Sequence, residues 1–89
     1  MTDLDDVLRA LADPTRRDLL RTVLRQPGQS TAQLVSRTDG MTRWGVMKHL
    51  TVLRDARLIQ TMAEGRHRRH FPERGALRSL RQWLDEVAP

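Results

Sequence analysis

Cysteine is absent from this sequence, and aromatic residues are scarce. Without a thiol, the chain can form neither a disulfide framework nor a thiolate metal site. Trp44, Phe71 and Trp83 are its only aromatic residues, so the core has to be built from aliphatic side chains. At 89 residues the chain suffices for one small domain and is too short for two. We therefore expect residues 1–89 to form a single domain.

Long apolar runs and catalytic motifs are missing as well. No segment approaches the roughly 18 consecutive apolar residues that a membrane-spanning helix needs. The acidic start, MTDLDD, lacks the basic and apolar regions of a signal peptide. These absences predict a cytoplasmic protein with no membrane partner. Neither a Gly-rich phosphate loop nor a catalytic spacing of Ser, His and Asp is present, so no enzymatic activity and no cofactor are expected.

Positive charge is concentrated in the middle of the chain. Residues 37–74 hold nine basic and four acidic residues, whereas residues 1–36 and 75–89 are each neutral overall. The net charge of +5 therefore comes from one segment, which indicates a surface for a polyanion. Fifteen of the sixteen basic residues are arginine, whose guanidinium group suits bidentate contacts with phosphate and guanine.

Helix signals recur through the first half of the chain. Apolar residues at helical spacing predict a first helix over residues 4–12. Asp13-Pro14 has the form of an N-cap residue followed by proline in the first turn, which predicts that a second helix begins there. Pro27-Gly28 is expected to end that helix.

A helix-turn-helix is predicted over residues 30–56. Ser30 and Gln33 have the spacing of a capping box at the start of a short helix. Thr42 is a candidate N-cap for a longer helix that runs to about Ala56. The apolar residues that we expect to face inward from this longer helix are Val46, Leu50 and Leu53.

A β-hairpin and a terminal helix complete the predicted domain. Two strand-forming runs on either side of Glu64-Gly65 predict a wing over residues 58–71. An apolar stripe predicts a last helix over residues 76–87. The expected fold class is mainly α with a small β-hairpin: a winged helix-turn-helix of five helices plus a wing.

This arrangement identifies candidate DNA-binding residues. In a winged helix-turn-helix, the second helix of the motif enters the major groove and the hairpin contacts the backbone or the minor groove. Arg43 suits guanine, whereas Lys48 suits phosphate. Three arginines on the wing repel one another unless DNA phosphate neutralises them; the alternatives are separation by solvent or pairing with Glu64 and Glu73. The candidates are Thr42, Arg43, Trp44, Met47, Lys48, His49, Thr51, Arg66, Arg68 and Arg69.

Trp44 and Met47 leave two interpretations open. Each side chain can contact DNA, where Trp44 would meet a thymine methyl group or a sugar, or can be covered within the protein. Because large apolar side chains usually find cover, we expect Trp44 to pack against the preceding helix. We expect Met47 to fill a gap in the core.

Histidine spacing argues against a metal site. His67 and His70 stand three residues apart in a predicted strand, so they point to opposite faces. No cluster of carboxylates accompanies them or His49. No metal is therefore expected.

Two segments resemble the ArsR-type family of winged helix-turn-helix repressors. They are ALADPTRR, which ends at Arg17, and the segment from Met41 to Leu53; the Gly65-Arg66 turn, with basic residues leading to an aromatic one, adds to the likeness. The resemblance implies a homodimer that pairs through its first and last helices (residues 4–12 and 76–87), a palindromic operator, and repression by blocking promoter access. The interface residues that it implies are Leu4, Val7, Leu8, Leu11, Leu77, Leu80, Trp83, Leu84 and Val87.

The sequence departs from the family pattern in two places. Metal-sensing members carry a cysteine motif before the reading helix, or Asp and His ligands on the last helix. Residues 33–36 and 77–87 hold no such set, so the chain resembles the branch without a metal sensor. The family usually has glycine where this chain has Arg57, and arginine there costs about 1 kcal/mol if the left-handed backbone is kept.

Together these features predict a sequence-specific, DNA-binding transcriptional regulator that acts as a dimeric repressor. One alternative is a non-specific architectural or RNA-binding protein, because a basic winged domain can hold a duplex without reading it. Another is a protein-interaction module that recruits a partner through its terminal helix. A strong preference for one operator over random DNA would distinguish a specific regulator from the first alternative. A stable dimer in the absence of nucleic acid would argue against the second, because the terminal helix would already be occupied.

Overall fold

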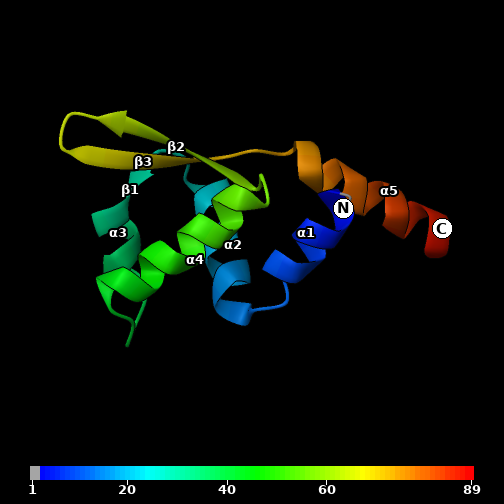
Figure 1. Cartoon of the computed structure of the whole chain (residues 1–89), viewed down its shortest axis with the longest axis horizontal. Helices are drawn as coiled ribbons and strands as arrows, with labels where there is room; N and C mark the ends of the chain where they lie inside the picture. Colours follow the sequence, from blue (N-terminus) through cyan, green and yellow to red (C-terminus); the bar gives the residue numbers. More distant parts are fainter. Residues whose placement is uncertain (1–2) are drawn as a thin grey trace.

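Residues 3–89 fold into five helices and a small antiparallel sheet, which confirms the predicted fold class. The computed structural model describes residues 3–89. Figure 1 places α3, α4 and the tip of the β2–β3 hairpin at one end of the molecule, and α1 with α5 at the other. The elements are α1 (Asp3–Ala10), α2 (Pro14–Arg25), β1 (Gln29–Ser30), α3 (Thr31–Ser36), α4 (Arg43–Asp55), β2 (Ile59–Glu64), β3 (His67–Pro72) and α5 (Gly75–Val87).

The junction between α1 and α2 is set by one cap and one proline. The Asp13 carboxylate accepts hydrogen bonds from the backbone N–H groups of Thr15 (2.8 Å) and Arg16 (3.1 Å). The bond from Arg16 is the main cause that lowers the pKa of Asp13. Pro14 has no N–H for the carbonyl of Ala10, which instead accepts from Arg16 Nε at 2.6 Å. α1 ends at Ala10, earlier than the predicted residue 12, where the Ala12 N–H donates to the Arg9 carbonyl at 3.3 Å in a tighter, three-residue turn.

The two helices of the helix-turn-helix start at the predicted caps. Ser30 and Gln33 form a reciprocal capping box at α3. The Thr42 hydroxyl accepts a hydrogen bond from the Gly45 N–H at 3.0 Å and caps α4. Each cap satisfies backbone donors that a helix leaves unpaired in its first turn, so the start of both helices is fixed locally.

The end of α4 confirms the left-handed position at Arg57, where φ is 61°. The Leu58 N–H donates to the Leu53 carbonyl, and the Arg57 N–H donates to the Arg54 carbonyl, both at 2.9 Å. This pair of bonds is the Schellman motif. Leu53 and Leu58 are both fully buried, which supplies the apolar contact that accompanies the motif.

The sheet has three strands in the order β1-β3-β2, one more than predicted. β3 pairs with β2 around the tight turn at Gly65-Arg66, where Gly65 has φ of 60°. It also pairs with β1, with Gln29 opposite His70. β1 escaped prediction because a strand of two residues shows no alternation and Ser30 also serves as the N-cap of α3.

The core lies between α2, α3, α4 and β2, and it is aliphatic as predicted. Its buried members include Leu19, Leu34, Val46, Leu50 and Ile59. α1 packs against α5, and Val7 of α1 and Ala76 of α5 belong to the same core. Among residues 3–89, no helix is both long and apolar enough to cross a membrane.

Candidate nucleic-acid interface

One face of α4 is buried and the opposite face carries most of the predicted DNA contacts. Val46, Leu50 and Leu53 point into the core, as the helical spacing predicted. Because α4 is anchored along one side only, its other side is free to enter a groove. The exposed residues on this free side, called the reading face below, are Arg43, Trp44, Met47, Lys48 and Thr51.

The prediction that Trp44 and Met47 are covered within the protein is wrong, because both side chains are exposed. Trp44 is 68% exposed and Met47 is 45% exposed. Trp44 lies about 160° around the helix from Val46 at 3.6 residues per turn, so its side chain points away from the core. Lys48 Nζ instead lies 4.4 Å from the centre of the Trp44 ring, a cation–π contact.

The wing meets the reading face at a shallow hollow of about 160 Å³. Arg43 and Met47 come from α4, and Arg66 and Arg68 come from the β2–β3 hairpin. All three arginines are exposed. The fold therefore brings cations from two separate elements to one concave surface, where a phosphate backbone can neutralise them.

Arg69, in contrast, is bound to other groups of the protein. Its Nη1 donates to the Gly28 carbonyl at 3.0 Å, and its Nε lies 3.3 Å from Glu64 Oε1. The sequence left open whether the wing arginines pair with glutamate, and Arg69 does pair with Glu64. Arg69 holds β3 to its neighbours, whereas Arg66 and Arg68 are exposed cations of the wing.

His49 likewise turns away from the exposed residues of α4. It is half-buried, and its Nδ1 lies 3.4 Å from Arg16 Nη1. Arg16 is always protonated and only donates, so His49 Nδ1 is the acceptor. Since Arg16 also donates to the Ala10 carbonyl, these contacts connect the α1–α2 junction to α4. Sequence reasoning missed this role of Arg16, because its partners are distant in the chain.

His70 is a second structural residue that sequence reasoning did not assign. It is 2% exposed, with Nε2 2.8 Å from Thr31 Oγ1 and Nδ1 3.0 Å from Thr61 Oγ1. Burial lowers the pKa of His70, and the nearby charges of Arg54 and Arg68 lower it further. The neutral ring thus joins the wing to the start of α3.

His67 and His70 point to opposite faces of β3, as the alternation of side chains along a strand predicted. His67 is exposed at the end of the hairpin, whereas His70 is buried. Within residues 3–89, no three His, Asp or Glu side chains gather closely enough to hold a metal ion.

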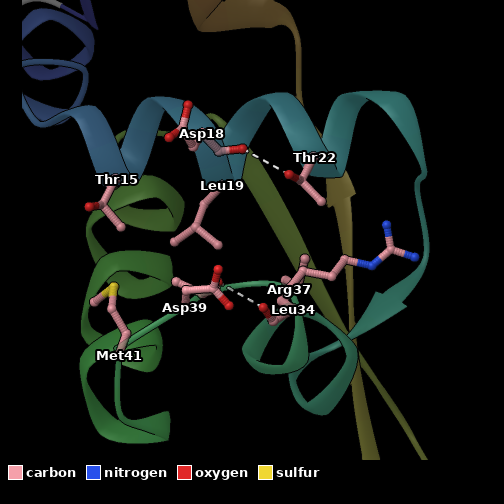
Figure 2. Close-up of a pocket in the computed structure, with 9 residues that line it drawn as sticks. Thr15, Asp18, Leu19, Thr22, Leu34, Arg37, Asp39 and Met41 are labelled. Atoms are coloured by element: carbon pink, nitrogen blue, oxygen red, sulfur yellow. Dashed lines mark hydrogen bonds between the residues drawn. The ribbon is translucent and has the colours of Figure 1, made fainter.

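A second hollow, of about 250 Å³, lies between α2, α3 and the segment before α4 (Figure 2). Its wall includes Asp18 and Asp39, whose carboxylates repel phosphate. The Thr22 hydroxyl donates to the Asp18 carbonyl at 2.9 Å on the same wall. With two acidic residues and one basic residue, Arg37, in its lining, this hollow does not extend the cationic surface.

An apolar face lies at the α1–α5 end of the molecule. The exposed apolar residues there are Leu8, Trp83, Leu84 and Val87. Beside them, a hollow of about 630 Å³ is lined by leucines of α2 and α5 and by three arginines. Val7 departs from the predicted interface, because it is 0% exposed within the single chain and has no surface left for a partner. Leu4, Leu11, Leu77 and Leu80 are half-buried.

Known proteins resemble this chain over nearly its whole length. A family model described as a helix-turn-helix domain matches residues 11–61. The crystal structure of an ArsR family transcriptional regulator has a TM-score of 0.86 at 34% identity, over 96% of this chain and 86% of that one. An ArsR-like transcriptional regulator from Rhodococcus sp. RHA1 has a TM-score of 0.82 at 28% identity, over 96% and 78% of the two chains. HlyU from Vibrio cholerae N16961, at 21% identity over 97% and 91% of the chains, shares the fold with a TM-score of 0.77. No curated protein gives a significant match.

Proposed function

Because this chain belongs to the ArsR family of winged helix-turn-helix, DNA-binding transcriptional regulators, we propose that it is a homodimeric repressor of a palindromic operator. One observation carries the proposal: Arg43 of α4 and Arg66 and Arg68 of the wing line a single hollow. Their combined charge complements a DNA groove with its flanking phosphates. A repressor that blocks a promoter acts where the DNA is, in the cytoplasm of the cell.

The roles proposed for the cations follow from their places on the fold. Arg43 is the first residue of α4, and the N-terminal residues of a reading helix contact base edges. It therefore reads guanine through its two-pronged guanidinium group. Arg66 and Arg68 stand at the hairpin and contact phosphate, which fixes position without reading sequence.

The proposed dimer uses the apolar face at the α1–α5 end. A twofold axis there places a second copy against Leu8, Leu84 and Val87, which are exposed in the single chain. The leucine-lined hollow beside α5 gives the partner helix a surface to fill. Because this end lies opposite the wing (Figure 1), dimerisation leaves both cationic surfaces free for two half-sites of a palindrome.

The test compares two kinds of arginine variant on an operator selected from random duplexes. Arg43→Ala should relax base preference at one position of each half-site, at a cost of about 1–3 kcal/mol. The double variant Arg66→Ala, Arg68→Ala should weaken binding to all sequences and reduce the salt slope of a dimer by about 3.6.

Arg9→Ala is the matched control, because Arg9 is an exposed cation of α1 that pairs with Asp6 and lies outside the hollow lined by Arg43, Arg66 and Arg68. It should leave base preference and salt slope unchanged. Equal, sequence-independent losses in all three proteins would contradict the assigned roles. Similar affinity of the unaltered chain for selected and random duplexes would support a non-specific architectural protein instead.

A further inference from the structure

The reading face carries a pair of large apolar side chains that are exposed in the single chain. Trp44 and Met47 are both exposed, and residues three apart on a helix are neighbours on its surface. Both lie in the first half of α4, the part of a reading helix that comes closest to base edges. An exposed pair of large apolar side chains gains free energy when a partner removes it from water.

The charges around the pair restrict what that partner can be. Lys48 stands over the Trp44 ring, and Met47 shares a hollow with Arg43, Arg66 and Arg68. An apolar protein surface would have to bury these cations without compensation, which is costly. The DNA major groove instead offers phosphates for the cations and, in the C5 methyl group of thymine, an apolar group on its floor.

We propose that Trp44 and Met47 read thymine methyl groups, so that each operator half-site carries thymine beneath the start of α4. This inference rests on the proposed DNA-binding function and names a second base, thymine, that the protein recognises in each half-site. Hydrogen bonds to Arg43 select guanine, whereas a methyl contact separates thymine from cytosine, which lacks the methyl group. The half-site is therefore expected to combine a guanine with nearby thymine.

Deoxyuridine substitution tests the inference directly. An operator selected by the wild-type chain from random duplexes is resynthesised with deoxyuridine in place of each thymine in turn. The exchange removes one methyl group and keeps every hydrogen-bonding group of the base pair. Losing one buried methyl contact corresponds to about a fourfold loss of affinity, and replacing both symmetric copies to about a fifteenfold loss.

Protein variants then assign the effect to the side chains. In Trp44→Ala or Met47→Ala, the thymine and deoxyuridine duplexes should bind equally well at the position that the altered side chain contacts. Val52→Ala is the matched control, since Val52 is an exposed apolar residue of the same helix that lines a hollow beside α1. This variant should keep the full sensitivity. All three positions are exposed, and thermal unfolding verifies that the variants fold.

Two results would overturn the inference. One is equal affinity of the wild-type chain for thymine and deoxyuridine at every position of the operator. The other is a methyl effect that persists in both alanine variants, because another residue would then read the methyl group. Either result leaves the proposed function standing. Failure to select any duplex sequence would instead remove the proposed function itself.

Discussion

Arg57 and His70 each show a single residue whose behaviour is set by its surroundings in the fold. Arg57 has a left-handed backbone, in which Cβ crowds the neighbouring carbonyl oxygen. The Schellman bonds at the end of α4 require this conformation, so the strain stays while the helix ends there. His70 is kept neutral by burial beside two arginines. Both features are open to measurement.

Replacing Arg57 with glycine should stabilise the fold by about 1 kcal/mol, because glycine adopts a positive φ without a Cβ clash. Urea denaturation measures the change in the free energy of unfolding. Arg57→Ala is the control: it removes the same charge and keeps the Cβ atom, so no comparable gain is expected. A similar gain in both variants would show that charge, and not backbone strain, sets the cost.

Acidification should destabilise the protein through His70. Its pKa in the folded chain lies below the ordinary value of 6.5, so the unfolded chain binds the proton first as the pH falls. The contribution to stability is complete above about pH 6.5 and declines below it, until the folded-state pKa is reached. Urea denaturation at a series of pH values between about 7.5 and 5 should show this decline.

A pair of histidine variants identifies the group responsible. His70→Gln should flatten the pH dependence in this range, whatever its effect on stability at neutral pH. His67→Gln, which alters an exposed histidine of the same strand, should leave the slope unchanged. An unaltered slope in the His70 variant would refute the assignment.

At the scale of elements, α4 is positioned by contacts at both ends and along its side. Thr42 caps its start, the Schellman bonds close its end, and Arg16 contacts it through His49. Thr42 also stands next to the proposed base-reading residue Arg43. The cap should therefore affect both stability and the geometry of DNA binding.

Thr42→Ala should lower the free energy of unfolding by about 1 kcal/mol, because one donor in the first turn of α4 loses its acceptor. Urea denaturation provides the measurement. Thr42→Ser retains the hydroxyl and should stay close to the wild type. Equal losses in the alanine and serine variants would mean that the methyl group of Thr42, and not its cap, is what stabilises the helix.

At the scale of the whole molecule, the two ends of the structure are assigned different partners. The cationic surface is proposed for DNA, and the apolar α1–α5 end for a second copy. A dimer that neutralises about four phosphates per protomer should show a log-log salt slope near −7. A monomer that binds one half-site would show about half of that slope.

Leu84→Asp should disrupt the proposed dimer, because it places a charge on the exposed apolar face of α5. Losing two leucine contacts across a twofold axis corresponds to at least about a hundredfold weaker association. Sedimentation without DNA measures the mass. Met62→Asp, which puts the same charge on an exposed residue of β2, should remain dimeric. A wild-type chain that stays monomeric at high concentration would refute the interface.

Several features of this fold depend only on neighbouring residues, and the sequence alone predicts them. The caps at Asp13, Ser30 and Thr42 are read within four residues of sequence, because each acts on its own helix end. The same holds for the inward-facing side of α4, since helical spacing fixes which residues share a side. The resemblance to ArsR-type proteins supplied the left-handed position at Arg57 in the same way, from adjacent residues.

Contacts between distant segments were decided only by the tertiary structure. Spacing shows that Val7 and Leu8 can pack, but not that Val7 is enclosed by its own chain while Leu8 stays exposed. It shows that Arg66, Arg68 and Arg69 are close in sequence, but not that Gly28 and Glu64 occupy Arg69. It leaves Trp44 with two environments, and the structure realises the exposed one. Burial depends on which surfaces the whole chain brings together, whereas a local pattern fixes only which residues of a helix share a side.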